Sequence, residues 1–450
     1  MTRRRDPQQL CPGRRAALLR LLFGPCGLGL RAFVTGVPMA VLTNPRRALA
    51  SDDEVSRAAA GAAQFLVVSS SQSGDPLNCN VPGTYGDAAV AHPVAATMAP
   101  TTFPLGKGQV TAAKPWASLP ASVLARTNFF HHRTDSVGHG DLLKSLRLSG
   151  GITRGEILPS LLASQTSTLL GTVQAQPITL GAFDAGEALT YGGRGIPMLR
   201  PSALKDVLTM PNGPLKNARK LRDDTLDKLS AWSKKNATAG QATFLDRWAN
   251  TQADLRRVSD SLLDAVSGIA TDDAAGQIAG TVALLQLKAS PVLSIHLPFG
   301  EDNHGDPGLA LEAEQHVTGV AAIGSLMAAL DAAGLADRVT FATLNVFGRT
   351  LSSRKTDGRD HNENHHVAVL IGKNIRAGVT GGIAPMAGDY GATGINSTDG
   401  AATPAGDVAQ SDTYAALAKT LGAAVGVAGI LLAFKGVVDT VNLFDLIVAT

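Results

Sequence analysis

Histidine and carboxylate side chains gather in three parts of this chain. Of its ten histidines, nine fall into groups at 131, 132 and 139, at 296, 304 and 316, and at 361, 365 and 366. Neutral imidazole and carboxylate are the usual ligands of zinc and related divalent ions, and one metal site draws its ligands from distant parts of a chain. Any one group alone is better explained as a solvated loop. The three groups together predict a metal site.

The densest group lies within 338–372. Two apolar runs rich in β-branched residues, at 339–347 and 366–371, are typical of strands. The polar loop between them contains Asp360 and His361, and it also contains Asp357, Glu363, His365 and His366. We expect Asp360 and His361 to bind the metal.

Two other predicted strands end in residues that can join such a site. The apolar run at 291–299 is followed by Asp302 and His304, whose spacing allows both side chains to point into one cleft. The run at 64–69 suits a buried parallel strand and is followed by Asp75. Ligands of open α/β sheets bind beyond the carboxyl ends of the strands, which is where these residues are expected. The Gly-Asp-Pro sequence around Asp75 is also typical of a simple turn.

Hydroxyl and imidazole groups follow a strand-like pattern at 122–130. The next residues include Thr134, Ser136 and His139 among glycines, and a helix is predicted to begin at 141. Such a junction can present an activated Ser or Thr to a metal and backbone N–H groups to an oxyanion. The alternative is a helix cap beside an exposed histidine pair. Thr134 or Ser136 is therefore the candidate nucleophile, and His139 is a further candidate catalytic residue.

The elements that must position these residues are typical of an α/β fold with a mainly parallel sheet. A long amphipathic helix predicted at 307–334 joins the strands at 291–299 and 339–347, and a strand, helix, strand unit favours parallel strands. Charges and helically spaced apolar residues at 202–285 indicate a helical insertion or lid. Residues 79–120, rich in Pro, Gly, Thr and Ala, predict a long surface excursion.

The first 50 residues differ from the rest in charge. They contain nine arginines and one acid, whereas the remainder carries 31 basic and 36 acidic residues, so no basic nucleic-acid surface is expected. Arg14 and Arg15 precede a mostly apolar stretch, and Ala-Leu-Ala at 48–50 precedes Ser51. This arrangement resembles a signal peptide for the twin-arginine export machinery. A retained anchor or an amphipathic membrane helix is the alternative, because Arg31 interrupts the apolar run.

Export would place a single domain of residues 51–450 in the periplasm or outside the cell, without a stable membrane span after processing. Cysteine usage agrees, because Cys11 and Cys26 lie in the leader and Cys79 alone cannot form an internal disulfide. The apolar run at 423–434 is too short to cross a bilayer and is predicted to be buried core.

Five motifs occur in order along the chain: Arg-Arg-Ala-Ala-Leu-Leu-Arg at 14–20, Gly-Asp-Pro-Leu-Asn at 74–78, Asp-x-His at 302–304, Phe-Gly-Arg-Thr at 347–350 and Gly-Arg-Asp-His at 358–361. Together they resemble a family of exported bacterial proteins of unknown function that is grouped with the alkaline phosphatase and sulfatase superfamily. The resemblance covers most of 51–450. It implies a mainly parallel sheet sandwiched by helices, two adjacent divalent ions and a Ser, Thr or modified Cys nucleophile. The metal ligands it implies are Asp75, Asp302, His304, Asp360 and His361.

The chain departs from the family pattern at several positions. Gln-Ser-Gly-Asp-Pro-Leu-Asn replaces the usual Gly-Gly-Asn-Asp-Gly-Leu-Asn, and Glu-Asp-Asn-His replaces Trp-Asp-Thr-His. Val346 stands where a glutamate usually precedes Phe-Gly-Arg, so the site is expected to lack one acceptor, for which Glu363 is the nearest replacement in sequence. The sulfatase nucleophile arises from Cys-x-Pro-x-Arg, whereas Cys79 begins Cys-Asn-Val-Pro-Gly, which argues against the sulfatase branch.

Two functions follow from these patterns. The first is a metal-dependent hydrolase of small anionic phosphate esters, in which Arg349 or Arg359 steadies the anionic oxygens. The second is a non-catalytic, metal-stabilised envelope protein with a binding or structural role. Zn, Mg, Mn and Ca are not distinguished by these residues.

Overall fold

The computed structural model describes residues 63–147, 157–181, 189–191, 194–204, 215–235, 269–299, 301–352 and 357–427, and also 237, 238, 242, 245 and 266. The predicted leader and the end of the apolar run at 423–434 lie outside these residues. Among the described residues, no helix combines the length and the apolar character that crossing a membrane requires.

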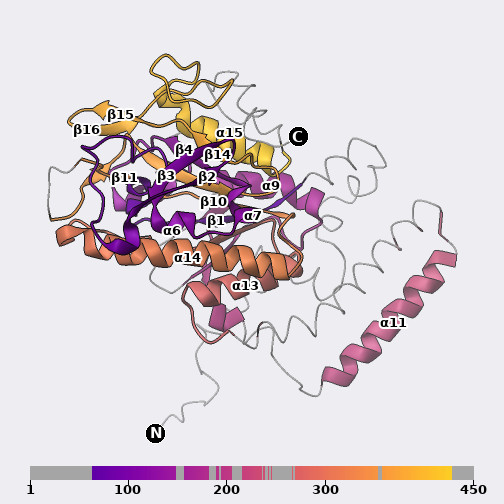
Figure 1. Cartoon of the computed structure of the whole chain (residues 1–450). Coiled ribbons are helices and arrows are strands. Elements are labelled where there is room, and N and C mark those ends of the chain that lie inside the picture. Colours follow the sequence, from indigo (N-terminus) through magenta and orange to yellow (C-terminus); the bar gives the residue numbers. More distant parts are fainter. Residues whose placement is uncertain are drawn as a thin grey trace, which may run out of the picture.

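The largest sheet among the described residues has eight strands (Figure 1). From edge to edge they are β14 (Gly378–Thr380), β4 (Thr127–His132), β13 (His366–Ile371), β10 (Val339–Thr343), β1 (Phe65–Ser69), β9 (Val292–Ile295), β5 (Ile178–Leu180) and β8 (Met198–Leu199). β13 runs antiparallel to both of its neighbours, and all other pairs are parallel. The predicted α/β fold with a mainly parallel sheet is confirmed.

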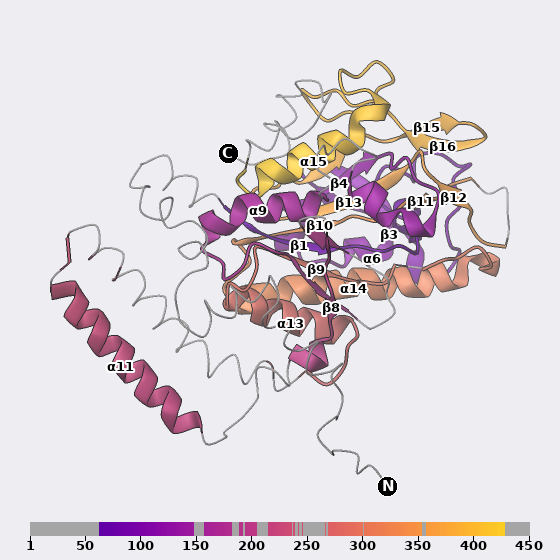
Figure 2. The same ribbon diagram turned by 180° about the vertical axis from the view of Figure 1, so that it is seen from behind.

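Helices cover both faces of this sheet (Figure 2). α13 (Ala274–Gln286) and α14 (Ala310–Ala332) pack on one face, and α9 (Leu158–Leu170) and α15 (Thr413–Ala424) pack on the other. Side chains alternate along β1, so Val67 belongs to the first apolar cluster and Val68 to the second. Two apolar faces are what a central parallel strand requires, because helices cover it on both sides.

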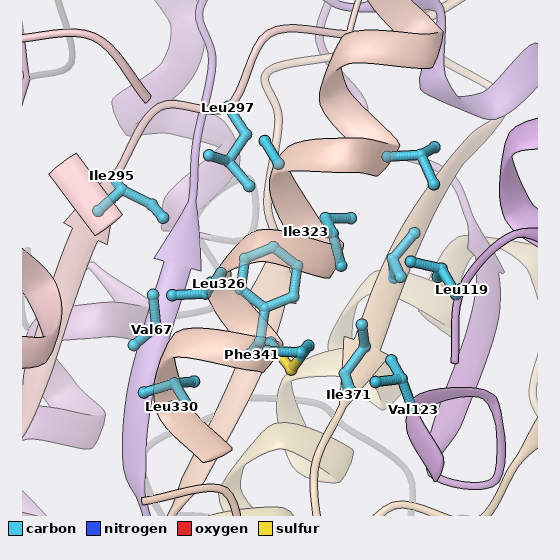
Figure 3. Close-up of a cluster of buried hydrophobic side chains, with 14 of the residues drawn as sticks. Val67, Leu119, Val123, Ile295, Leu297, Ile323, Leu326, Leu330, Phe341 and Ile371 are labelled. Carbon is cyan, nitrogen blue, oxygen red and sulfur yellow. The ribbon is translucent and has the colours of Figure 1, made fainter. Parts of the chain in front are cut away.

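Figure 3 shows the core between the sheet and α14, where Phe341 of β10 lies beside Ile323, Leu326 and Leu330. The three aliphatic residues recur at three- and four-residue spacing and so form one stripe of the helix. Truncating one such buried leucine to alanine typically costs about 2–5 kcal/mol. This stripe therefore accounts for the position of α14 against the sheet.

The strand ends bring several loops together. Ser69 at the end of β1 pairs with both Ile295 and Thr343, so β1, β9 and β10 end in register. His366 at the start of β13 pairs with His132 at the end of β4. The loops after β1, β4, β9 and β10 and the loop before β13 therefore meet at one edge, the edge at which open α/β sheets bind ligands.

Most predicted elements near this edge are confirmed, with shifted ends. The helix predicted at 307–334 consists of η5 (Pro307–Leu309) and α14, and it joins two strands that both pair with β1 in parallel. The strand predicted from 122 is wrong at its start, because α7 (Ala121–Leu124) occupies those residues. Pro120 precedes this helix, and the Thr127 hydroxyl donates to the Val123 carbonyl at its end (2.7 Å).

The segment 79–120, predicted to be a surface excursion, has many exposed residues but contains secondary structure of its own and is anchored in the core. It contains η2 (Ala96–Met98), a hairpin of β2 (Pro100–Leu105) and β3 (Gly108–Ala113), and α6 (Lys114–Ala117). Trp116 is fully buried and its ring meets Phe129 of β4 edge to face, with centroids 5.0 Å apart. This large aromatic side chain anchors the segment to the core. The prediction relied on the high content of Pro, Gly and Thr and did not take this anchor into account.

Helices also occur within the predicted insertion at 202–285. α11 (Leu215–Lys235) and α13 both lie there, but α13 is part of the layer that covers the sheet, so a lid is not its role. The remaining elements are short: η1 (Pro76–Cys79), η3 (His139–Asp141), α8 (Leu142–Leu146), β6 (Thr190–Tyr191), β7 (Arg194–Gly195), β11 (Gly348–Arg349), β12 (His361–Asn362), β15 (Ile383–Met386), β16 (Asp389–Ala392) and η6 (Gln410–Asp412).

Candidate metal centre

Four side chains meet at the edge where the loops gather. His139, Asp302, His304 and His361 each offer one ligand atom, and these atoms all lie within 4.8 Å of one another. His139 follows β4, Asp302 and His304 follow β9, and His361 lies in β12. Each of the three histidine groups in the sequence contributes one imidazole. The predicted convergence of these groups is confirmed for one residue of each.

The three imidazoles are each oriented through Nδ1. His139 Nδ1 lies 2.8 Å from the Gln72 carbonyl oxygen, and His361 Nδ1 lies 2.5 Å from the Val137 carbonyl oxygen. A carbonyl can only accept, so both Nδ1 atoms carry the proton and donate it. His304 Nδ1 faces the Asp360 carboxylate, with 3.5 Å between Nδ1 and Oδ1. Metal-binding histidines usually donate the N–H of the other ring nitrogen to a carbonyl or carboxylate in this way.

The Nε2 atoms point to one another and to Asp302. His304 Nε2 lies 2.8 Å from His361 Nε2, and His139 Nε2 lies 3.2 Å from Asp302 Oδ2. With the proton on Nδ1, His139 and His361 each present a lone pair at Nε2. His304 Nε2 lies at hydrogen-bond distance from the His361 lone pair, so either a proton or a metal ion lies between these two nitrogens. Three imidazoles and one carboxylate are a donor set that fits a divalent ion such as Zn²⁺.

Local charges favour the ligand forms of these side chains. Burial holds the pKa of His361 below its ordinary value; the hydrogen bond to the Val137 carbonyl opposes this shift and the positive charge of Arg349 adds to it, so the neutral ring is favoured at pH 7. Partial burial is the largest influence on Asp302 and opposes its ionisation, but the hydrogen bond and the charge of Arg349 still lower its pKa. Metal ligation requires neutral imidazole and ionised carboxylate, which are the forms favoured here.

Arg349 contacts the centre from the protein interior, through Asp302. Its side chain is completely buried, and Nη2 donates to Asp302 Oδ1 (2.7 Å) and to the Ser73 carbonyl (2.7 Å). Nε donates to the Gly74 carbonyl (2.5 Å), and Nη1 donates to the Arg359 carbonyl (3.3 Å). The guanidinium therefore fixes one ligand and the loop after β1. Its predicted contact with substrate stays a prediction.

The centre is open to solvent. The side chains of His139, His304 and Asp302 retain 39%, 44% and 46% of their exposed area. Structural zinc sites are closed by their four ligands, whereas catalytic metal sites keep one side free for water or substrate. The exposure of this centre is thus typical of a site that a small ligand can reach.

Asp75 and Asp360 lie outside the four-residue group. Asp75 is buried and its Oδ1 accepts from the backbone N–H of Glu301 (3.0 Å), so it holds the loop that carries Asp302. Burial raises the pKa of Asp75, while the charge of His296 opposes this shift. Asp360 instead faces His304 Nδ1 and orients that ring. Direct metal binding by these two carboxylates, and the second ion that it would support, stay predictions.

The predicted nucleophiles occupy the loop that leads to His139. Thr134 is buried, and its backbone N–H and hydroxyl both donate to the Glu363 carbonyl, at 2.9 and 3.4 Å. The Ser136 hydroxyl is also buried and donates to Asp141 Oδ2 (3.3 Å). Nucleophilic attack by either hydroxyl stays a prediction. His139, expected among the catalytic residues, lies in the ligand group, and its place in the first histidine group was the available signal.

Arg359, predicted to contact substrate, is buried and bonded to groups in the protein interior. It is buried and forms an ion pair with Glu312 of α14, with 2.6 Å between Nε and Oε2. Nη1 donates to the Thr350 carbonyl (2.7 Å), and Nη2 donates to the Ala91 carbonyl (2.8 Å). These bonds direct its donors into the protein interior. Substrate binding by Arg359 stays a prediction, and the geometry favours a supporting role.

Val346 and Glu363, which the family pattern singled out, are also placed by the structure. The Val346 side chain is completely buried in the apolar cluster beneath α9 and α15, and its carbonyl accepts from the Ser145 hydroxyl (2.7 Å). Glu363 contributes its carbonyl to the loop around Thr134, and its carboxylate is not in the four-residue group. Compensation for Val346 by Glu363 stays a prediction.

Comparison with known proteins gives one partial match. Residues 219–411 match a family model described as protein of unknown function (DUF1501), which covers less than half of the chain. The matched region includes Asp302, His304 and His361, whereas His139 precedes it. No curated protein matches the chain.

Proposed function

We propose that this chain is a metal-dependent hydrolase that holds a divalent ion between His139, Asp302, His304 and His361 and acts on small anionic phosphate esters. The observation that carries the proposal is the shared orientation of the three imidazoles. Each Nδ1 faces an oxygen, and the Nε2 atoms face one another and the Asp302 carboxylate. This is the arrangement of histidines that bind metals through Nε2.

A divalent ion at this position would supply Lewis-acid chemistry, which favours attack on a phosphoryl centre. The residues of the chain prepare the site for it. Arg349 keeps Asp302 ionised, and the carbonyls of Gln72 and Val137 keep two imidazoles in the tautomer that leaves Nε2 free. The loop at 134–139 would supply the nucleophile from Thr134 or Ser136.

A second candidate is a non-catalytic envelope protein whose ion stabilises the loops at the sheet edge. The burial of Arg349 and Arg359 favours it, because both guanidinium groups bind interior oxygens. Phosphoryl transfer usually relies on a cationic group that steadies the anionic oxygens. The ion itself would have to serve that purpose in a hydrolase built on this site.

We further propose that the chain is exported by the twin-arginine route to the periplasm or the exterior. The support is in the sequence: an arginine-rich leader with a single acid precedes a region of net negative charge. Arg14, Arg15 and the small residues at 48–50 have the types and order of a signal for that route. The first 50 residues lie outside the described part of the structure.

The test uses the purified chain. Metal content after dialysis and turnover of aryl phosphate mono- and diesters and an aryl sulfate are measured for the native protein, Asp302→Asn and His361→Ala. Asp331→Asn is the matched control, because Asp331 is an exposed carboxylate of α14 outside the four-residue group. We expect bound divalent metal and phosphate-ester turnover in the native protein and the control, and loss of both in the two site variants. Metal without turnover would favour the non-catalytic candidate. If protein produced in medium that contains divalent metal ions holds none, both the hydrolase and the metal-stabilised envelope protein are overturned.

A further inference from the structure

Glu312 is completely buried in the first turn of α14, yet both of its carboxylate oxygens have partners. Oε1 accepts from Asn80 Nδ2 (2.7 Å) and from Arg359 Nη2 (2.9 Å). Oε2 accepts from Asn303 Nδ2 (2.9 Å) and from Arg359 Nε (2.6 Å). The two parallel bonds to Arg359 fix the guanidinium in one orientation, as bidentate pairs do.

Asn303 connects this ion pair to one loop of the metal centre. It lies between Asp302 and His304 in the sequence, and it is buried while both of its neighbours are exposed. Its side-chain amide donates to Glu312, and its carbonyl accepts from the Arg359 backbone N–H (3.1 Å). The two ligands, Asp302 and His304, therefore flank a residue that is held through both its side chain and its backbone.

Arg359 connects the same pair to the other loop, which carries Asp360 and His361. Its Nη1 donates to the Thr350 carbonyl, and the Thr350 backbone N–H donates to the Asp360 carbonyl (2.9 Å). Gly358, just before Arg359, has a φ of +136°, and a Cβ there would lie 2.2 Å from the Asn303 carbonyl oxygen. The two loops are thus in backbone contact at a position where glycine alone fits.

We propose that Glu312, Arg359 and Asn303 form a positioning clamp that sets the distance between the Asp302/His304 loop and the His361 loop, and thereby the metal affinity of the centre. The inference rests on the metal site proposed above and deepens it. None of the three side chains belongs to the ligand group, so the clamp acts through the backbone of the ligand loops.

The clamp is expected to affect metal affinity because the ligand atoms of the two loops can bind one ion only when the loops are held at the distance that coordination requires. Groups that orient metal ligands typically change metal affinity by about 10- to 100-fold when they are mutated. Arg359→Lys would keep the charge but would lose the planar guanidinium that bonds Glu312 twice. Asn303→Ala would remove the amide that bonds the loop to Glu312 and would leave the ion pair in place.

The experiment titrates the metal-free full chain with Co²⁺ and records both the dissociation constant and the visible absorption band, whose shape reports the geometry around the ion. Arg359→Lys and Asn303→Ala are compared with the native protein. The matched control is Arg126→Lys, since Arg126 also binds a carbonyl and a carboxylate, those of Ala336 and Asp337, before the start of β4. We expect about 10- to 100-fold weaker Co²⁺ binding and an altered band in both clamp variants, and neither change in the control.

The outcomes separate the clamp from the metal site itself. If the native protein binds no Co²⁺, the proposed metal site fails and the clamp fails with it. If the native protein binds Co²⁺ and both variants match its affinity and band, the clamp is wrong while the metal site stands. If Arg359→Lys does not fold, Asn303→Ala decides alone, with its melting temperature without metal confirming an intact fold.

Discussion

Mild acid should destabilise this protein, because histidines are buried in neutral form between β4 and β13. His131 Nε2 donates to the Pro82 carbonyl (2.9 Å), so its Nδ1 must accept from His365 Nε2 (2.9 Å). His365 Nδ1 in turn accepts from Asn78 Nδ2 (3.1 Å). Every ring nitrogen in this series has one role while both rings are neutral. An added proton would place two donors opposite each other.

The size of the effect follows from the pKa values. Burial lowers the pKa of His131 and of His132 to about 4, and that of His316 in α14 to about 3. An unfolded histidine titrates near 6.5, so below about pH 6.5 the unfolded chain binds protons that the folded chain excludes. Stability is therefore complete above that pH and is lost as the pH falls toward 4. At about pH 5 each of the three costs about 2 kcal/mol, a large part of a typical stability of about 5–15 kcal/mol.

Urea unfolding followed by circular dichroism between about pH 8 and pH 5 measures this loss. His316→Leu provides the comparison, because among the described residues neither of its ring nitrogens has a hydrogen-bond partner and the ring packs against Trp116 and Phe299. We expect the free energy of unfolding to fall by about 2 kcal/mol less in this variant between pH 8 and pH 5. An equal fall in both proteins, or no fall in the native protein, would refute the reasoning.

Three other perturbations have expected outcomes. Replacing Arg14 and Arg15 by Lys should leave precursor in the cytoplasm, as cell fractionation would show, and normal appearance of processed protein outside it would contradict the twin-arginine assignment. Asp360→Ala should weaken metal binding by about 10- to 100-fold, because His304 loses the carboxylate that faces its Nδ1; unchanged affinity in a metal titration would show that this contact is incidental. Val346→Glu should lower the free energy of unfolding by about 3 kcal/mol or more, because it would bury an unpaired carboxylate in an apolar cluster. A stable variant with increased phosphatase activity would instead mean that the glutamate reaches the metal centre.

The type of fold and most of the ligand loops can be predicted from local patterns in the sequence. The apolar runs at 64–69 and 366–371 correspond closely to β1 and β13, and the helix predicted at 307–334 is η5 followed by α14. These elements depend on local patterns, because alternation and helical spacing decide which faces of an element can be buried. Asp302, His304 and His361 were found for a related reason, since polar residues directly after or before strands lie at the ligand-binding edge.

Which of the polar residues meet depends on contacts between segments that are far apart in the sequence. His139 joins the ligand group because the sheet pairs β4 with β13 and brings the Val137 carbonyl to His361, 224 residues away in the chain. The Arg359 side chain points into the protein interior because Glu312 of α14 and the Ala91 carbonyl together satisfy its donors. Such contacts join segments that are far apart in the sequence, and the periodic pattern of apolar residues does not predict them. A charged residue of an exposed loop therefore cannot be told from one of a buried ion pair by the sequence pattern alone.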